Sequence, residues 1–188
     1  MKKLSEFIKP YLAIAFGALL FLFYLNWLGS EGAFLAVGII AIVFAAGYLA
    51  VGILGVVFGE RLPKVLKLVF DIFTVSAFPL LIFVYFIVLV TSVPVENIGP
   101  AGWVILIVNL AASLGLVGLY ITTRFVKVKL LDRITYLFAV AFILALALNL
   151  VFDFTGDPIV LGNITVVELI IDALYSYMLI NALKKEAK

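Results

Sequence analysis

Six long apolar runs, separated by short polar segments, dominate the sequence. A helix needs about 20 residues, with a range of about 17–25, to cross a hydrocarbon core about 30 Å thick, so each run is long enough for one crossing. A helix also satisfies its own backbone hydrogen bonds, as lipid requires. The sequence therefore predicts an all-α polytopic integral membrane bundle of six transmembrane helices, at residues 10–29, 33–58, 68–94, 102–123, 134–154 and 166–183.

The composition supports a single membrane domain over residues 1–188. Hydrophobic residues make up 66% of the chain and charged residues 13%, against about 45–50% and about 25% in soluble domains. A soluble fold of this length cannot bury so much apolar surface. The lipid bilayer is therefore the expected partner of most side chains.

The basic residues predict the orientation. All 13 Lys and Arg fall in four segments that alternate with the apolar runs. Basic residues concentrate on the cytoplasmic side of a membrane, so we expect both termini, the second loop and the fourth loop to be cytoplasmic in a multi-pass protein of the cell membrane. This distribution forms no basic patch for nucleic acid. The segments are Lys2/Lys3/Lys9, Arg61/Lys64/Lys67, Arg124/Lys127/Lys129/Arg133 and Lys184/Lys185/Lys188.

The sequence lacks cysteine and histidine. This excludes disulfides, thiol nucleophiles, histidine bases and zinc or haem held by these residues. It also contains no phosphate-binding, dinucleotide-binding or nucleophile-elbow glycine motif. We therefore predict that the chain is not an enzyme and holds no cofactor or metal.

Small residues recur at steps of three and four in the second and fourth runs. In lipid, close backbone approach along small residues drives helix association. This pattern predicts a packing seam, which either holds the bundle together internally or docks another membrane subunit or a second copy. Its residues are Gly38, Ala41, Ala45, Gly52, Gly55 and Gly59 in the second run, and Gly115 and Gly118 in the fourth.

Acidic and amide residues near the outer ends of the last two runs form the candidate polar site. Asn149 and Asp153 lie four residues apart on one face of the fifth predicted helix. Glu168 and Asp172 do the same on the sixth, with Asp172 about 9 Å into the helix. A short connection joins the two helices, so these groups could converge on a cation, a protonated substrate or a proton. Alternatively, Asp153 and Glu168 are solvated at the interface.

Three further polar features lie within or beside the runs. Asn109 is expected to make an interhelical hydrogen bond or to line a pore, and belongs to the same candidate site. Asp71 lies four residues after Lys67, a spacing that permits an ion pair on one helix face. Pro79 falls inside the third run and predicts a kink there.

The chain also resembles a transporter family at the level of size and topology. Six helices, about 190 residues and two cytoplasmic ends are shared with the substrate-binding subunits of energy-coupling-factor vitamin transporters. The Ala13-x-x-x-Gly17 spacing in the first run resembles their small-residue docking motif. Such an analogy carries no functional residue across.

Two functions remain open from the sequence. The first is transport: binding or moving a small solute or cation, alone or as the membrane subunit of a larger transporter. The second is a non-catalytic membrane subunit, assembly factor or regulator that acts through helix–helix docking. A cavity reaching Asp172, Asn149 and Asn109 would favour transport, whereas a closed bundle with an exposed small-residue stripe would favour docking.

Overall fold

A computed structural model describes residues 2–92, 94, 99–154 and 166–184, without the side chains of residues 2–8, 60, 150–154 and 166. The described part of the chain contains helices and no strand, as the all-α prediction requires. Each predicted span coincides mainly with one long helix, although residues 26–29 of the first span form a 3-10 turn. The helices are α1 (Lys2–Leu25), α2 (Gly32–Phe58), α3 (Lys64–Ser92), α4 (Pro100–Phe125), α5 (Lys129–Phe154) and α6 (Val166–Lys184), with short 3-10 turns η1 (Asn26–Gly29) and η2 (Gly59–Arg61).

Five helices are long and apolar enough to cross a membrane. These candidate spans cover Lys9–Gly29, Gly32–Phe58, Lys64–Ser92, Pro100–Phe125 and Lys129–Asn149. The described part of α6 is not in this set, and α6 carries three charged residues: Glu168, Asp172 and Lys184. The chain is therefore a multi-pass membrane protein by the apolar character of its helices.

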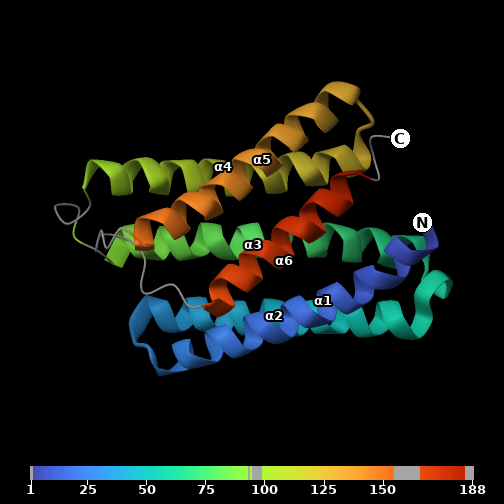
Figure 1. Cartoon of the computed structure of the whole chain (residues 1–188), viewed down its shortest axis with the longest axis horizontal. Helices are drawn as coiled ribbons and strands as arrows, with labels where there is room; N and C mark the ends of the chain where they lie inside the picture. Colours follow the sequence, from blue (N-terminus) through green and yellow to red (C-terminus); the bar gives the residue numbers. More distant parts are fainter. Residues whose placement is uncertain (1, 93, 95–98, 155–165, 185–188) are drawn as a thin grey trace.

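The helices form two antiparallel pairs with α3 between them (Figure 1). α1 packs along α2 and α4 packs along α5, while α3 contacts both α2 and α4. α6 crosses the bundle obliquely and contacts α1, α3 and α5. It thus bridges the two pairs.

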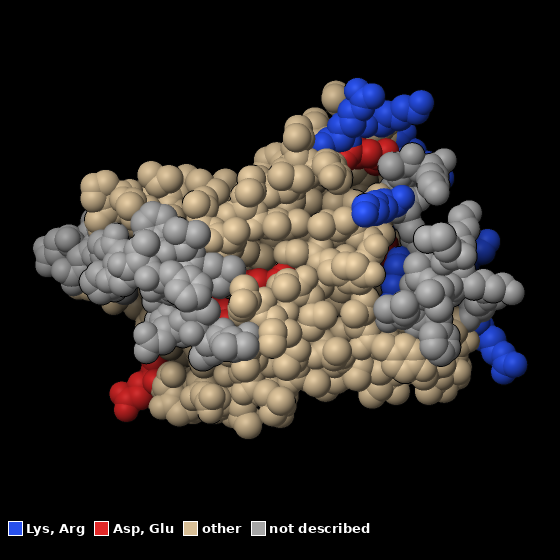
Figure 2. Space-filling view, viewed as in Figure 1, with Lys and Arg blue, Asp and Glu red and all other residues tan. Residues whose placement is uncertain are grey.

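The described Lys and Arg side chains gather at one end of the molecule (Figure 2). At this basic end α1 begins, α2 leads into α3, α4 leads into α5, and α6 ends. The opposite end contains the turn between α1 and α2 and the start of α6. The described residues of all four basic segments therefore lie at one end of the fold, as expected if that end faces one side of a membrane.

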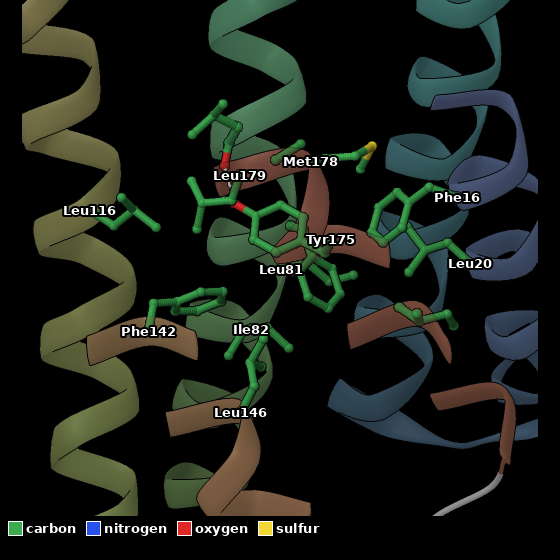
Figure 3. Packing of buried hydrophobic residues seen from close by; sticks show 14 of the residues in the cluster. Phe16, Leu20, Leu81, Ile82, Leu116, Phe142, Leu146, Tyr175, Met178 and Leu179 are labelled. Atoms are coloured by element: carbon green, nitrogen blue, oxygen red, sulfur yellow. Dashed lines mark hydrogen bonds between the residues drawn. The ribbon is translucent and has the colours of Figure 1, made fainter. Parts of the chain in front are cut away.

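Tyr175 of α6 lies at the centre of the core (Figure 3). Its fully buried ring is 4.7 Å from that of Phe78 in α3, 5.8 Å from Phe142 in α5 and 5.9 Å from Phe16 in α1, measured between ring centroids. The inclined and edge-on rings have the geometry that aromatic pairs prefer. This cluster fastens α6 to three other helices.

Pro79 lies inside α3, as the sequence predicts, and is buried. Proline lacks the N–H that would bond the carbonyl four residues earlier, which here belongs to Val75. The Tyr175 hydroxyl of α6 donates to the Val75 carbonyl oxygen instead. In the same turn, the Tyr48 hydroxyl of α2 donates to the Thr74 carbonyl oxygen at 2.9 Å. Two neighbouring helices therefore supply donors around the proline.

Candidate functional site

Two acids of the candidate polar site lie on α6, within electrostatic range of an aromatic hydroxyl from another helix. Glu168 and Asp172 are one turn apart and half-buried. Both acids, and Tyr85 of α3, lie within electrostatic range of the buried Tyr24 hydroxyl of α1. α1, α3 and α6 thus place two carboxylates and a second phenol around Tyr24 in the half of the bundle away from the basic end. Such a group suits a proton or a cation.

Two observations define what the described part of this acidic group can hold. Asp153 belongs to the last turn of α5, but its side chain lies outside the described residues, as does Asp157 of the following connection. Among the described residues, no three Asp and Glu side chains are placed to hold a metal ion together. The arrangement therefore offers a proton or a weakly held cation two carboxylates from one helix.

The predicted amides Asn109 and Asn149 bond each other across the interface of α4 and α5. Asn109 is fully buried and its Nδ2 donates to Asn149 Oδ1 at 3.0 Å and to the Ile105 carbonyl oxygen at 2.9 Å. Asn149 Nδ2 donates back to Asn109 Oδ1 at 3.3 Å. Each amide thus gives the other a hydrogen-bond partner, which lipid cannot supply, and the pair joins α4 to α5.

Near the basic end, Asp71 of α3 pairs with Arg124 of α4. Arg124 Nη2 lies 3.0 Å from Asp71 Oδ2, and the Tyr120 hydroxyl donates to the same oxygen at 3.0 Å. The guanidinium also lies over the Tyr120 ring, 4.2 Å from its centroid, and donates to the Tyr120 hydroxyl. The sequence spacing permits an ion pair between Lys67 and Asp71 within α3. The ion pair that joins α3 to α4 is made by Arg124, which lies 53 positions after Asp71 in the chain.

A cavity of about 280 Å³ lies near the basic end between α1, α2, α3 and α6. Its polar lining comes from Lys9 of α1, Lys67, Asp71 and Thr74 of α3, and Asn181 of α6. Apolar side chains and small residues of the same helices form the rest of the wall. A mainly apolar cavity with a few convergent polar groups is the usual form of a small-molecule site.

Sequence reasoning missed this cavity. In the sequence, Lys9 and Lys67 indicate orientation, and Lys67 also permits an ion pair with Asp71, whereas the acids predict a site at the other end. A usable signal was present, because Ala13, Gly55 and Ala182 are small where the helices meet and line the cavity together with these lysines. None of Asp172, Asn149 and Asn109 lines it.

The small-residue seam of α2 packs inward against α1. Gly38, Ala41, Ala45 and Gly52 are buried, and a Cβ added at Gly52 would lie 2.7 Å from the Pro10 carbonyl oxygen. Gly17 of the Ala13-x-x-x-Gly17 pair packs on the same helix, since its Cβ would lie 2.8 Å from the Ala45 carbonyl oxygen. Most of the seam is thus part of the bundle itself.

The remaining seam positions have different surroundings. A Cβ at Gly55 would lie 3.1 Å from Pro10 Cβ, and one at Gly115 would lie 2.1 Å from the Phe138 ring of α5. Gly59 follows the end of α2 with a φ of 48°, a conformation that favours glycine, and a Cβ added there would meet no atom within 4 Å. Its role is therefore in the turn after the helix and not in helix packing. Gly118 of α4 is exposed, and a Cβ added there would also meet no atom within 4 Å.

Comparison with known proteins adds no relative: no protein family, no curated protein and no solved structure matches the chain.

Proposed function

We propose that the chain is a six-span protein of the cell membrane that binds a small solute and takes part in its transport, alone or as the membrane subunit of a larger transporter. The sixth crossing rests on α6, whose 19 residues extend about 28 Å at 1.5 Å per residue. It runs from the opposite end of the bundle to the basic end, beside helices that are apolar enough to span.

The observation that carries the proposal is the double role of α6. Its Met178, Asn181 and Ala182 line the cavity, while its Asp172 lies in the acidic group about 13 Å further along the same helix, by the rise of 1.5 Å per residue. A solute in the cavity and a cation or proton at Asp172 would therefore act on one helix. Such a helix can couple two sites if it has two arrangements that each ligand biases.

The test is a cavity-filling substitution in the purified full-length protein. Ala182→Phe places a large side chain in the cavity wall, whereas Ala46→Phe adds the same volume on an exposed face of α2. Melting temperatures are measured with inorganic phosphate, Na⁺, amino acids and short-chain phospholipids. We expect at least one ligand to stabilise the wild type and Ala46→Phe and to lose its effect on Ala182→Phe.

Asp172→Asn then tests coupling. Uptake of the ligand found in the stability measurement is followed in proteoliposomes with and without gradients of Na⁺ and H⁺. If Asp172 couples solute to a cation, Asp172→Asn should keep binding in the cavity but abolish gradient-driven uptake. Uptake by this variant at the wild-type rate would remove Asp172 from the transport role.

Docking to another membrane protein is the alternative, favoured by one observation. On α4, Ala111 and Gly118 face outward, so part of the small-residue pattern is free of the internal packing. A stoichiometric partner that co-purifies with the wild type and is lost in Gly118→Leu, together with no ligand in the cavity, would support docking. Either function is non-enzymatic, which agrees with a sequence that lacks histidine and cysteine.

A further inference from the structure

Positive charges outnumber negative charges among the described side chains around the cavity. Of its lining side chains, Lys9 and Lys67 are cations and Asp71 is the only carboxylate among those described. Arg124 lies 3.0 Å from that carboxylate and adds a third positive charge. Among the described side chains, these three cations and one carboxylate give a net charge of +2 around the cavity. This sum favours an anionic ligand.

The lysines also lie at a particular depth. Lys9 directly precedes the apolar run of residues 10–29 in α1, and Lys67 belongs to the first turn of α3. With the basic end at the cytoplasmic interface, both ammonium groups reach the level of the lipid headgroups, where basic pockets between helices bind phosphate groups. The cavity wall then continues along α3 to Val75, eight residues or about 12 Å deeper.

Size and lining narrow the ligand further. A cavity of about 280 Å³ has the size of a small-ligand pocket, which suits a headgroup or a small organic anion. Asn181 of α6 adds an amide that donates to the Tyr177 carbonyl oxygen at 2.9 Å and carries a second N–H hydrogen. Apolar walls beyond these polar groups suit a ligand whose other part is hydrocarbon.

We propose that the cavity binds a phosphate group carried on an apolar or small organic body, held by Lys9 and Lys67 with Asn181 as a further donor. The phosphate is either the headgroup of an anionic lipid or a small soluble phosphate. This inference rests on the proposed function, since it names the ligand class of the same cavity.

The experiment uses isothermal titration of the full-length protein in a non-ionic maltoside detergent. The probes are dihexanoyl phosphatidic acid, inorganic phosphate and, as a control without net charge, dihexanoyl phosphatidylcholine. We expect phosphatidic acid to bind at least tenfold more tightly than phosphatidylcholine. Binding of inorganic phosphate as well identifies a soluble phosphate as sufficient, whereas binding of phosphatidic acid alone identifies a lipid headgroup.

Matched variants assign the binding to the cavity. Lys9→Gln and Lys67→Gln should each weaken the binding of phosphatidic acid at least tenfold. Lys64→Gln, which removes an exposed charge from the same end of α3 outside the cavity lining, should change it less than twofold. Lys67→Arg keeps the charge and should bind as the wild type does, which separates lost binding from lost folding.

Two results would overturn the inference. One is that neither phosphate probe binds the wild type, and the other is that Lys64→Gln weakens binding as much as Lys67→Gln. If a neutral or cationic ligand then stabilises the wild type and fails with Ala182→Phe, the proposed function stands and only its ligand class is wrong. If no ligand is sensitive to Ala182→Phe, both proposals fail.

Discussion

At the scale of single residues, the hydrogen bond from Tyr175 to the Val75 carbonyl is the contact with the clearest physical cause. Pro79 removes the helical donor of that carbonyl, and lipid offers no replacement. A buried carbonyl left without a partner costs about 1–3 kcal/mol. The phenol of α6 therefore compensates for a proline in α3, and the bond joins residues 100 positions apart in the chain.

We expect Tyr175→Phe to lower the free energy of unfolding by about 1 kcal/mol, because the ring packing stays while the hydroxyl is lost; interhelical hydrogen bonds in membrane proteins average about 0.6 kcal/mol and reach about 1.7. Reversible unfolding in sodium dodecyl sulfate measures the change. Tyr177→Phe on the same helix is the control, since Tyr177 is 51% exposed.

A double-mutant cycle with Pro79→Ala tests the cause. Alanine restores the N–H donor of the Val75 carbonyl, so Tyr175→Phe should cost less in that background. An equal loss in both backgrounds would show that the hydroxyl stabilises the fold independently of the proline.

These residue contacts were only partly predictable from the sequence. Asn109 in an apolar run predicts an interhelical hydrogen bond, and this prediction is confirmed, because a lone amide in lipid needs a partner. Its partner Asn149 depends on which helices are neighbours, which sequence spacing does not define. Tyr175 and Tyr177 look alike in the sequence, yet one is fully buried and the other faces outward. Pro79 is the signal present in the sequence, since it leaves the Val75 carbonyl without its helical donor and that carbonyl requires a donor from elsewhere.

At the scale of the elements, the α1–α2 pair depends on close backbone contact. Where Gly17 and Gly52 meet the partner helix, an added Cβ would approach backbone atoms to 3.0 Å or less. Backbone atoms cannot move aside as a flexible side chain can, so these positions exclude larger residues. The small-residue seam thereby allows α1 to pack closely against α2 along the length of the two helices.

We expect Gly52→Leu to destabilise the protein by about 1–3 kcal/mol or to prevent folding, as overpacking does in tight interfaces. Gly118→Leu adds the same side chain where nothing lies within 4 Å, so it should change the unfolding free energy by less than about 0.5 kcal/mol. The same unfolding assay measures both. A normally folded and equally stable Gly52→Leu would show that the seam is not needed.

The positions of the helices were more predictable than their neighbours. Predicted ends and observed ends agree to within a few residues for 33–58 against Gly32–Phe58 and for 102–123 against Pro100–Phe125. The fifth helix begins at Lys129, five residues before the apolar run, because helical hydrogen bonds continue into polar sequence. The oblique course of α6 had no sequence signal, since it follows from packing against three helices at once.

At the scale of the whole molecule, charge and length together argue for six crossings. The described Lys and Arg occupy one end of the bundle (Figure 2), and the chain returns to that end after every second helix (Figure 1). α6 ends there with Lys184. If α6 stayed on the far side of the membrane, its C-terminal lysines would face outward, against the preference of basic residues for the cytoplasm.

Cysteine labelling tests this topology cleanly, because the natural chain has no cysteine. Intact cells that express Ser30→Cys, Lys127→Cys or Lys184→Cys are treated with a membrane-impermeant maleimide. Ser30→Cys, in the turn between η1 and α2, should be labelled from outside, whereas the other two should react only after permeabilisation. Labelling of Lys184→Cys in intact cells, with Lys127→Cys still protected, would mean that α6 does not cross. The cavity would then lose its C-terminal helix to the other side of the membrane, so this one measurement bears on the binding site as well as on the fold.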